Sequence, residues 1–183
     1  MTEQGADQAI ASTRRWLERI VIGLSLCPFA AAPFNKNRIL YVVDDADTLD
    51  AIYEAFLETL YTLFTSDPQD NETALLILTR GLTAFDDYLE ALGLVEDAIT
   101  EAGLDGMVQV ASFHPEYRFA DAPADDPANY TNRSPYPMFH LIREDGLTAA
   151  LESLPHPERI PQENIERLRA LGTARIKALL EGD

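Results

Sequence analysis

The chain alternates apolar stretches of two kinds, and their spacing predicts strands and helices in turn. Residues 38–45, 73–79 and 107–113 are short runs of mostly apolar residues, several of them β-branched, which are typical of buried strands. Between these runs, residues 48–64 and 85–102 place apolar side chains at helical spacing. The central part of the chain is therefore predicted as strand, helix, strand, helix, strand.

Further elements flank this central part. The same patterns predict a helix over 12–26, a fourth strand over 138–144, a short helix over 146–154 and a last helix over 162–180. Residues 1–11 are polar and acidic, and we expect a frayed tail there.

The order of the elements indicates the fold class. The run 73–79 is apolar on both faces, as in a strand that helices cover on both sides. Helical connections between successive strands favour parallel pairing. The sequence therefore predicts a single α/β domain over 12–183, with a mostly parallel, mixed sheet of about four strands flanked by four or five helices.

Residues 114–137 interrupt this pattern with five prolines and almost no periodicity. Irregular segments of this length are uncommon in compact domains and are usually functional or disordered. We expect a long proline-rich loop after the third strand. It is interpreted either as a partly mobile lid over a ligand site or as a structural strap.

The ends of the predicted strands indicate where a ligand would bind. Open parallel α/β sheets bind ligands outside the carboxyl ends of their strands. Arg80 and His114 follow two of these strands, so both are expected at that edge, with Arg80 as a possible anion-binding group. His114 is a candidate general acid or base because imidazole titrates near neutrality. The alternative is a structural histidine that holds the loop.

Other arginines are candidates for holding an anion. Arg118 and Arg133 lie within 114–137, Arg143 follows shortly after, and Asn132 and Ser134 are hydrogen-bonding neighbours of Arg133. A guanidinium group is costly to bury without an anionic partner. That partner is either a carboxylate or phosphate ligand, or one of the protein's own acidic side chains.

Cys27 is the single cysteine, which excludes a disulfide within the chain and fits a reducing cytosol. It is interpreted either as a nucleophile with His114 as its base, or as a small core residue at the end of the first helix. A three-ligand metal site from Cys27, His114 and His140 is a weaker alternative, because no two of them form a short ligand pair. No metal or cofactor is assigned on these grounds.

Charge narrows the possible partners. The formal net charge is −17, and residues 41–105 contain 16 acidic residues and one basic residue. Such a surface repels nucleic acids and anionic membranes, and no apolar run is long enough to span a bilayer. The glycine-rich phosphate-binding motifs are absent from the sequence. The acidic face is either a solubilising surface or a docking face for a basic protein partner.

The stretches "LCPFA", "SFHPEYRF" and "NRSPYPMFHLIRE" together resemble a bacterial family of proteins, domain-of-unknown-function family 1415. The resemblance covers residues 12–180 and implies a free-standing, cytosolic, single-domain protein. It names no catalytic residue, so whether the protein is an enzyme stays open.

The leading hypothesis is therefore an enzyme or a pocket that acts on a small anionic metabolite, a carboxylate or a phosphate, at the carboxyl edge of the sheet. The alternatives are a non-catalytic interaction domain that uses the acidic face 41–105 and, more weakly, the Cys/His metal site.

Overall fold

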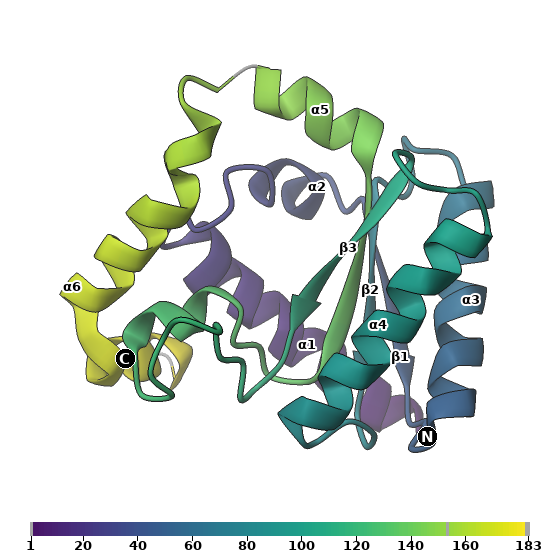
Figure 1. Cartoon of the computed structure of the whole chain (residues 1–183), viewed down its shortest axis with the longest axis horizontal. Coiled ribbons are helices and arrows are strands. Elements are labelled where there is room, and N and C mark those ends of the chain that lie inside the picture. The colour runs from purple at the N-terminus through teal and green to yellow at the C-terminus, as the bar shows by residue number, and fades with distance from the viewer. Residues whose placement is uncertain (1, 153, 182–183) are drawn as a thin grey trace.

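A four-stranded mixed sheet forms the centre of the computed structural model, which describes residues 2–152 and 154–181 (Figure 1). The strands are β1 (Ile39–Asp44), β2 (Thr73–Leu78), β3 (Val108–Phe113) and β4 (Met138–Arg143). β1 and β2 are parallel, whereas β4 is antiparallel to both of its neighbours, β2 and β3. The carboxyl ends of β1, β2 and β3 therefore share one edge of the sheet, and the predicted α/β class is confirmed.

The strand order β1-β2-β4-β3 leaves only one pair of parallel neighbours within the described sheet. β4 lies between β2 and β3, although β2 and β3 run in the same direction. The apolar pattern of a strand records its burial, while its neighbours depend on which backbone edges meet in space. For this reason the sequence predicted the strands and not their order.

Helices cover both faces of the sheet (Figure 1). α3 (Leu49–Thr65) and α4 (Phe85–Glu101) pack on one face. α1 (Glu3–Trp16), the π-helix η1 (Leu17–Ile22) and α6 (Ile160–Glu181) pack on the other. β2 is buried along its whole length and contributes side chains to the clusters on both faces of the sheet, which confirms the expectation of a strand covered on both sides.

The first helix begins at Glu3, so the frayed tail predicted over 1–11 is wrong for the described residues of that range. Thr2 caps the helix, because its hydroxyl oxygen accepts a backbone N–H at 3.2 Å. Ala9 and Trp16, seven residues apart, are buried on one face of the helix. Small residues such as alanine give a weak apolar signal, which is why the pattern missed this part of the helix.

The remaining helices follow β4, except for one short helix that the pattern did not predict. That short helix is α2 (Ala31–Asn35), and it follows the turn at the end of η1. α5 (Glu144–Glu152) and the 3-10 helix η3 (Pro157–Arg159) lead into α6. The described residues thus contain six α-helices, where four or five were expected. Across these residues, no helix combines the length and apolarity that a membrane span requires.

The segment between β3 and β4 is less irregular than the predicted loop, because it contains the 3-10 helix η2 (Pro127–Thr131). Its two ends are joined by backbone hydrogen bonds. The N–H of His114 donates to the carbonyl of Asn132 at 3.1 Å, and the N–H of Ser134 donates to the carbonyl of His114 at 3.4 Å. The chain therefore leaves and re-enters the sheet at one place.

The middle of this segment is fixed by one buried side chain, Asn129, and by one ion pair to another helix. The buried Asn129 accepts the N–H of Phe119 at 3.1 Å and donates to a backbone carbonyl at 2.8 Å. Asp126 forms an ion pair of 2.7 Å with Arg169 of α6. These contacts are those of a structural strap, and the motion of a lid stays a prediction.

Candidate functional site

His114 follows β3 at the carboxyl edge of the sheet, and its side chain is fully buried. Its Nδ1 accepts the N–H of Glu116 at 3.0 Å, so Nε2 carries the proton and donates to the carbonyl of Leu82 at 2.9 Å. The ring packs against Phe85 and Tyr88 of α4, at centroid distances of 5.3 and 5.2 Å. Burial lowers the pKa of His114 and keeps the imidazole neutral. With both nitrogens occupied, the geometry favours the structural role over acid–base chemistry.

Cys27 and His114 lie on opposite faces of the sheet. Cys27 packs with the cluster around Trp16 and Phe113, while His114 packs against the α4 layer. The sheet separates the two side chains, so they form no nucleophile–base pair.

The predicted three-ligand metal site from Cys27, His114 and His140 is likewise not assembled. Within the described part of the chain, no group of three or more His, Cys, Asp or Glu side chains is placed to hold a metal ion.

Two predicted anion-binding arginines are engaged elsewhere. Arg80 lies on the exposed loop after β2 and pairs with Asp47 at 3.0 Å. Arg143 ends the antiparallel strand β4 and therefore lies at the opposite edge of the sheet. Its guanidinium donates to the carbonyl of Leu63 and, at 2.9 Å, to that of Ser66, at the end of α3. The carbonyl of Leu63 also accepts the N–H and the hydroxyl of Ser66, at 3.2 and 2.8 Å, so Arg143 adds to the capping of this helix end.

Asn132 and Ser134 lie beside Arg133, and each donates a side-chain hydrogen bond to a backbone carbonyl. The amide nitrogen of Asn132 donates to the carbonyl of Ser112 at 2.9 Å. The hydroxyl of Ser134 donates to the carbonyl of Tyr136 at 2.5 Å. Both side chains thus close the segment between β3 and β4; the single hydroxyl proton of Ser134 is already used, and one N–H of the Asn132 amide is engaged by the backbone.

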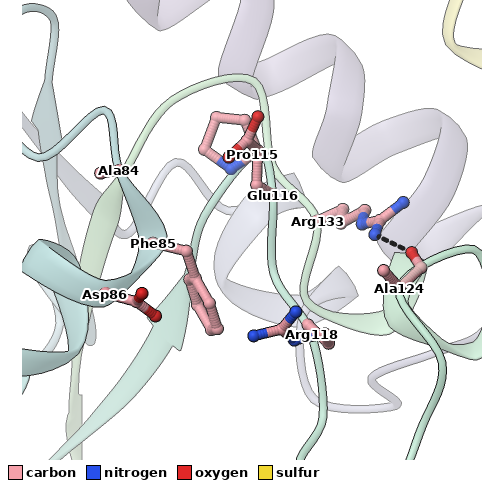
Figure 2. A pocket seen from close by; sticks show the side chains of 8 residues that line it. All are labelled: Ala84, Phe85, Asp86, Pro115, Glu116, Arg118, Ala124 and Arg133. Atoms are coloured by element: carbon pink, nitrogen blue, oxygen red, sulfur yellow. Dashed lines mark hydrogen bonds between the residues drawn. The ribbon is translucent and has the colours of Figure 1, made fainter.

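Arg118 and Arg133 are the two predicted anion-binding arginines that line a common hollow. They line a hollow of about 550 Å³, here called the Arg118 groove (Figure 2). Its lining consists of Ala84, Phe85, Asp86, Pro115, Glu116, Arg118, Ala124 and Arg133. Arg118 is exposed and has no hydrogen bond or ion pair to any described residue. The carboxylates of Asp86 and Glu116 offset the two positive charges.

Arg133 is held in place by the segment around it. Its Nε donates to the carbonyl of Tyr117 at 3.0 Å, and one terminal nitrogen donates to the carbonyl of Ala124 at 2.7 Å (Figure 2). The guanidinium also lies over the ring of Tyr130, 5.0 Å from its centroid. A guanidinium has five N–H groups, so donors remain available after these two bonds.

A second hollow, of about 300 Å³, shares Pro115 and Arg133 with the groove and is here called the Arg15 hollow. Its lining consists of Ser12, Arg15, Trp16, Pro115, Tyr130, Arg133, Ser134, Pro135 and Leu180. Two arginines and no acidic residue are in this lining. The indole N–H of Trp16 is buried and has no hydrogen-bond partner within the described chain.

Arg15 and Trp16, which line this hollow, were not predicted from the sequence as candidate site residues. The available signal was the spacing of Ser12 and Arg15, three residues apart on one helix face. In the structure Arg15 donates to the hydroxyl of Ser12 at 3.3 Å. That spacing is common on solvated helices and would not by itself have indicated a site.

Comparison with known proteins gives a family and no activity. A family model described as "Protein of unknown function (DUF1415)" matches residues 8–178. No curated protein and no solved structure matches the chain. The match spans nearly the whole sequence and confirms the predicted resemblance; the chain belongs to the DUF1415 family.

Proposed function

We propose that the protein binds a small carboxylate or phosphate in the Arg15 hollow, between the guanidinium groups of Arg15 and Arg133. The observation that carries the proposal is the charge of the lining, which has two arginines and no carboxylate. The hollow lies at the carboxyl edge of the sheet, since Pro115 follows the end of β3 and Ser134 precedes the start of the antiparallel strand β4. Its volume of about 300 Å³ corresponds to about ten water molecules, which suits a small metabolite.

The preorganisation of Arg133 supports this proposal. Two backbone carbonyls and the Tyr130 ring fix the guanidinium, so little conformational freedom is lost when an anion binds. Because His114 is buried and fully hydrogen-bonded, binding rather than acid–base catalysis is proposed for this hollow.

The Arg118 groove suits a free anion less well. Asp86 and Glu116 face the same space as its two arginines (Figure 2), and their charges cancel much of the attraction. Arg118 would then act mainly by attracting anions toward the neighbouring hollow.

Calorimetric titration with inorganic phosphate and with succinate, at low ionic strength, tests the proposal. Arg15→Ala and Arg118→Ala are matched variants, because each removes one exposed arginine from one of the two hollows. A hydrogen bond to a charged group contributes about 1.5–3 kcal/mol, so Arg15→Ala should weaken binding roughly 10- to 100-fold. Arg118→Ala should leave the affinity within about threefold of wild type, since a rim charge contributes little directly.

Two results would refute the proposal. One is no binding of either anion by the wild-type protein. The other is a loss of affinity in Arg118→Ala with none in Arg15→Ala, which would move the site to the groove. Thermal melting of each variant serves as the control for folding.

A second candidate function, the docking of a basic protein partner, rests on the outer surface of α3. Leu57, Tyr61 and Phe64 are exposed by 38, 71 and 46%, and their spacing places them on one side of the helix. Exposed acidic residues such as Glu54 and Glu58 flank them. We propose as its occupant an amphipathic helix with basic residues beside its apolar stripe.

Titration with a synthetic helical Lys/Leu peptide tests this second function. Binding should weaken with salt and be lost in Tyr61→Lys, whereas Leu94→Lys on α4 is the control at another exposed apolar position. Self-association through the same residues, seen by sedimentation, would contradict a heterologous partner.

A further inference from the structure

A third pocket, of about 240 Å³, lies on the α1 side of the sheet and shares no lining residue with the Arg15 hollow. The sheet contributes its floor near the start of β1 and β2, and α2 and α5 contribute walls. Most of the lining is apolar, and its titratable side chains are Cys27, Glu72, His140 and Arg143. An apolar pocket with a few polar groups is the usual form of a site for a small molecule.

Cys27 occupies one wall of this pocket, in the turn that leads into α2. The sequence predicts Cys27 at the end of the first helix, whereas in the structure the helical segment ends at Ile22. Burial raises the pKa of Cys27, and the backbone N–H groups of Phe29 and Ala30 lower it to a smaller extent. The group is therefore a thiol that needs a base to become a nucleophile.

His140 lines the same pocket, and its hydrogen bonds determine which nitrogen carries the proton. The hydroxyl of Thr73 lies 2.6 Å from the carbonyl of Leu141 and 2.6 Å from Nε2 of His140. A hydroxyl has one proton, and a carbonyl can only accept, so Thr73 donates to Leu141. Thr73 must then accept from His140, which places the proton on Nε2.

Nδ1 of His140 is consequently an unprotonated nitrogen, and it has no hydrogen-bond partner among the described residues. Burial lowers the pKa of His140 to about 4, so the ring is neutral at pH 7. Glu72 and Arg143 are the other charged groups in the lining, and Arg143 is already bound to the end of α3. The pocket thus combines a thiol with a free imidazole lone pair.

We propose that this pocket is a catalytic site for small thioesters or esters with a short apolar acyl group, in which Cys27 is the nucleophile and His140 the base. Thr73 is a positioning residue, because it fixes the imidazole tautomer and does not touch the substrate. The proposal concerns a different site from the Arg15 hollow and does not depend on anion binding there.

The reaction balances without an added oxidant or reductant. The Cys27 proton moves to Nδ1 of His140 as the sulfur attacks the acyl carbon and forms a carbon–sulfur bond. The bond from the acyl carbon to the leaving thiol or alcohol breaks, and His140 returns the proton to that group. Water then attacks the acyl-cysteine, again with His140 as base, and releases a carboxylic acid and the free thiol.

The test uses p-nitrophenyl butyrate as the probe, with p-nitrophenolate release and the intact mass of the protein as readouts. The wild-type chain should gain one butyryl group, and Cys27→Ser should not gain it. The butyrate ester should acylate the protein roughly tenfold faster than p-nitrophenyl acetate, because its acyl group places two more methylene groups in the apolar pocket. Iodoacetamide alkylation measures the accessibility of the thiol independently.

The acylation rate of a His140 variant and its dependence on pH distinguish a base from a purely structural histidine. His140→Gln keeps a donor for Thr73 and should slow acylation about 10²- to 10⁴-fold. The wild-type rate should rise through the pKa of His140, about 4, and then stay level to pH 7, while His140→Gln should keep rising with pH. Thr73→Val should slow acylation, and its matched control Thr73→Ser, which keeps the hydroxyl, should not.

The proposal is overturned if the wild-type chain neither gains a butyryl group nor releases p-nitrophenolate faster than Cys27→Ser, whether or not iodoacetamide alkylates Cys27. It is also overturned if His140→Gln reacts with the wild-type rate and pH profile. Arg15→Ala should acylate normally and Cys27→Ser should bind phosphate normally, so the two proposals fail independently.

Discussion

Tyr88 connects the end of β3 to the start of β4, and its hydroxyl can be removed without changing the shape of the side chain. The hydroxyl donates to the carbonyl of Met138 at 2.8 Å and accepts the N–H of Phe113 at 3.0 Å. Met138 and Phe113 are the last register pair of these two strands. The ring of Tyr88 is fully buried beside His114. Tyr88→Phe therefore removes the oxygen that links β3 to β4 by two hydrogen bonds at the carboxyl edge of the sheet.

The magnitude follows from the two partners that lose their hydrogen bonds. Each neutral hydrogen bond contributes about 0.5–1.5 kcal/mol to stability, and a buried group left without a partner costs about 1–3 kcal/mol. Because the carbonyl of Met138 is buried, we expect Tyr88→Phe to lower the free energy of unfolding by about 2 kcal/mol. In a domain of this size, that corresponds to a decrease in Tm of about 4–8 °C.

Urea denaturation of wild type and Tyr88→Phe gives the free energy directly, and an unchanged m-value would show that the unfolded state is the same. Tyr61→Phe is the matched control, since Tyr61 is 71% exposed and should change stability by less than about 0.5 kcal/mol. A loss in Tyr88→Phe no larger than that of the control would refute the bridging role of the hydroxyl.

Three further substitutions have defined outcomes. In Gly81→Ala the new Cβ would lie 2.5 Å from a backbone oxygen of the β1–α3 loop, so a loss of about 1–3 kcal/mol is expected in urea denaturation; Gly93→Ala, with open space, should not lose stability. Arg143→Ala should cost about 1.5–3 kcal/mol by the same measurement, because it removes the charged hydrogen bonds to the carbonyls of Leu63 and Ser66 at the end of α3. Hydrogen bonds from Arg169 lower the pKa of Asp126 below its ordinary value of 3.8. The ion pair therefore stabilises the fold above pH 3.8, and this stabilisation is lost as the pH falls through the lower pKa of the folded state. The Tm advantage of wild type over Asp126→Asn should accordingly disappear in strong acid, and an advantage that persists there would contradict the linkage.

The strands and long helices were predictable because each is amphipathic or fully apolar over its own length. β2 illustrates this, since the run 73–79 is apolar on both faces and the strand Thr73–Leu78 is buried on both sides. The start of α1 was not predictable in this way, because its inner face begins with Ala9, a small residue whose burial depends on the sheet below it.

The candidate site was predictable only in part. The sequence brought Arg118 and Arg133 to one region, since both belong to the segment that leaves the carboxyl edge, and the structure places them in one groove. Arg15 comes from a helix more than 100 positions earlier, and only the packing of that helix beside the segment makes it a neighbour of Arg133.

By itself, the sequence determined which stretches fold into strands and helices and that the chain is strongly acidic, because local periodicity and composition carry that information. The tertiary structure decided the roles of the polar side chains. His114 became a buried, doubly hydrogen-bonded residue, and Cys27 was placed in a pocket with His140 rather than with His114. The physical reason is that the chemistry of a histidine or a cysteine depends on the partners and burial that distant residues provide, and the order of the strands selects those partners.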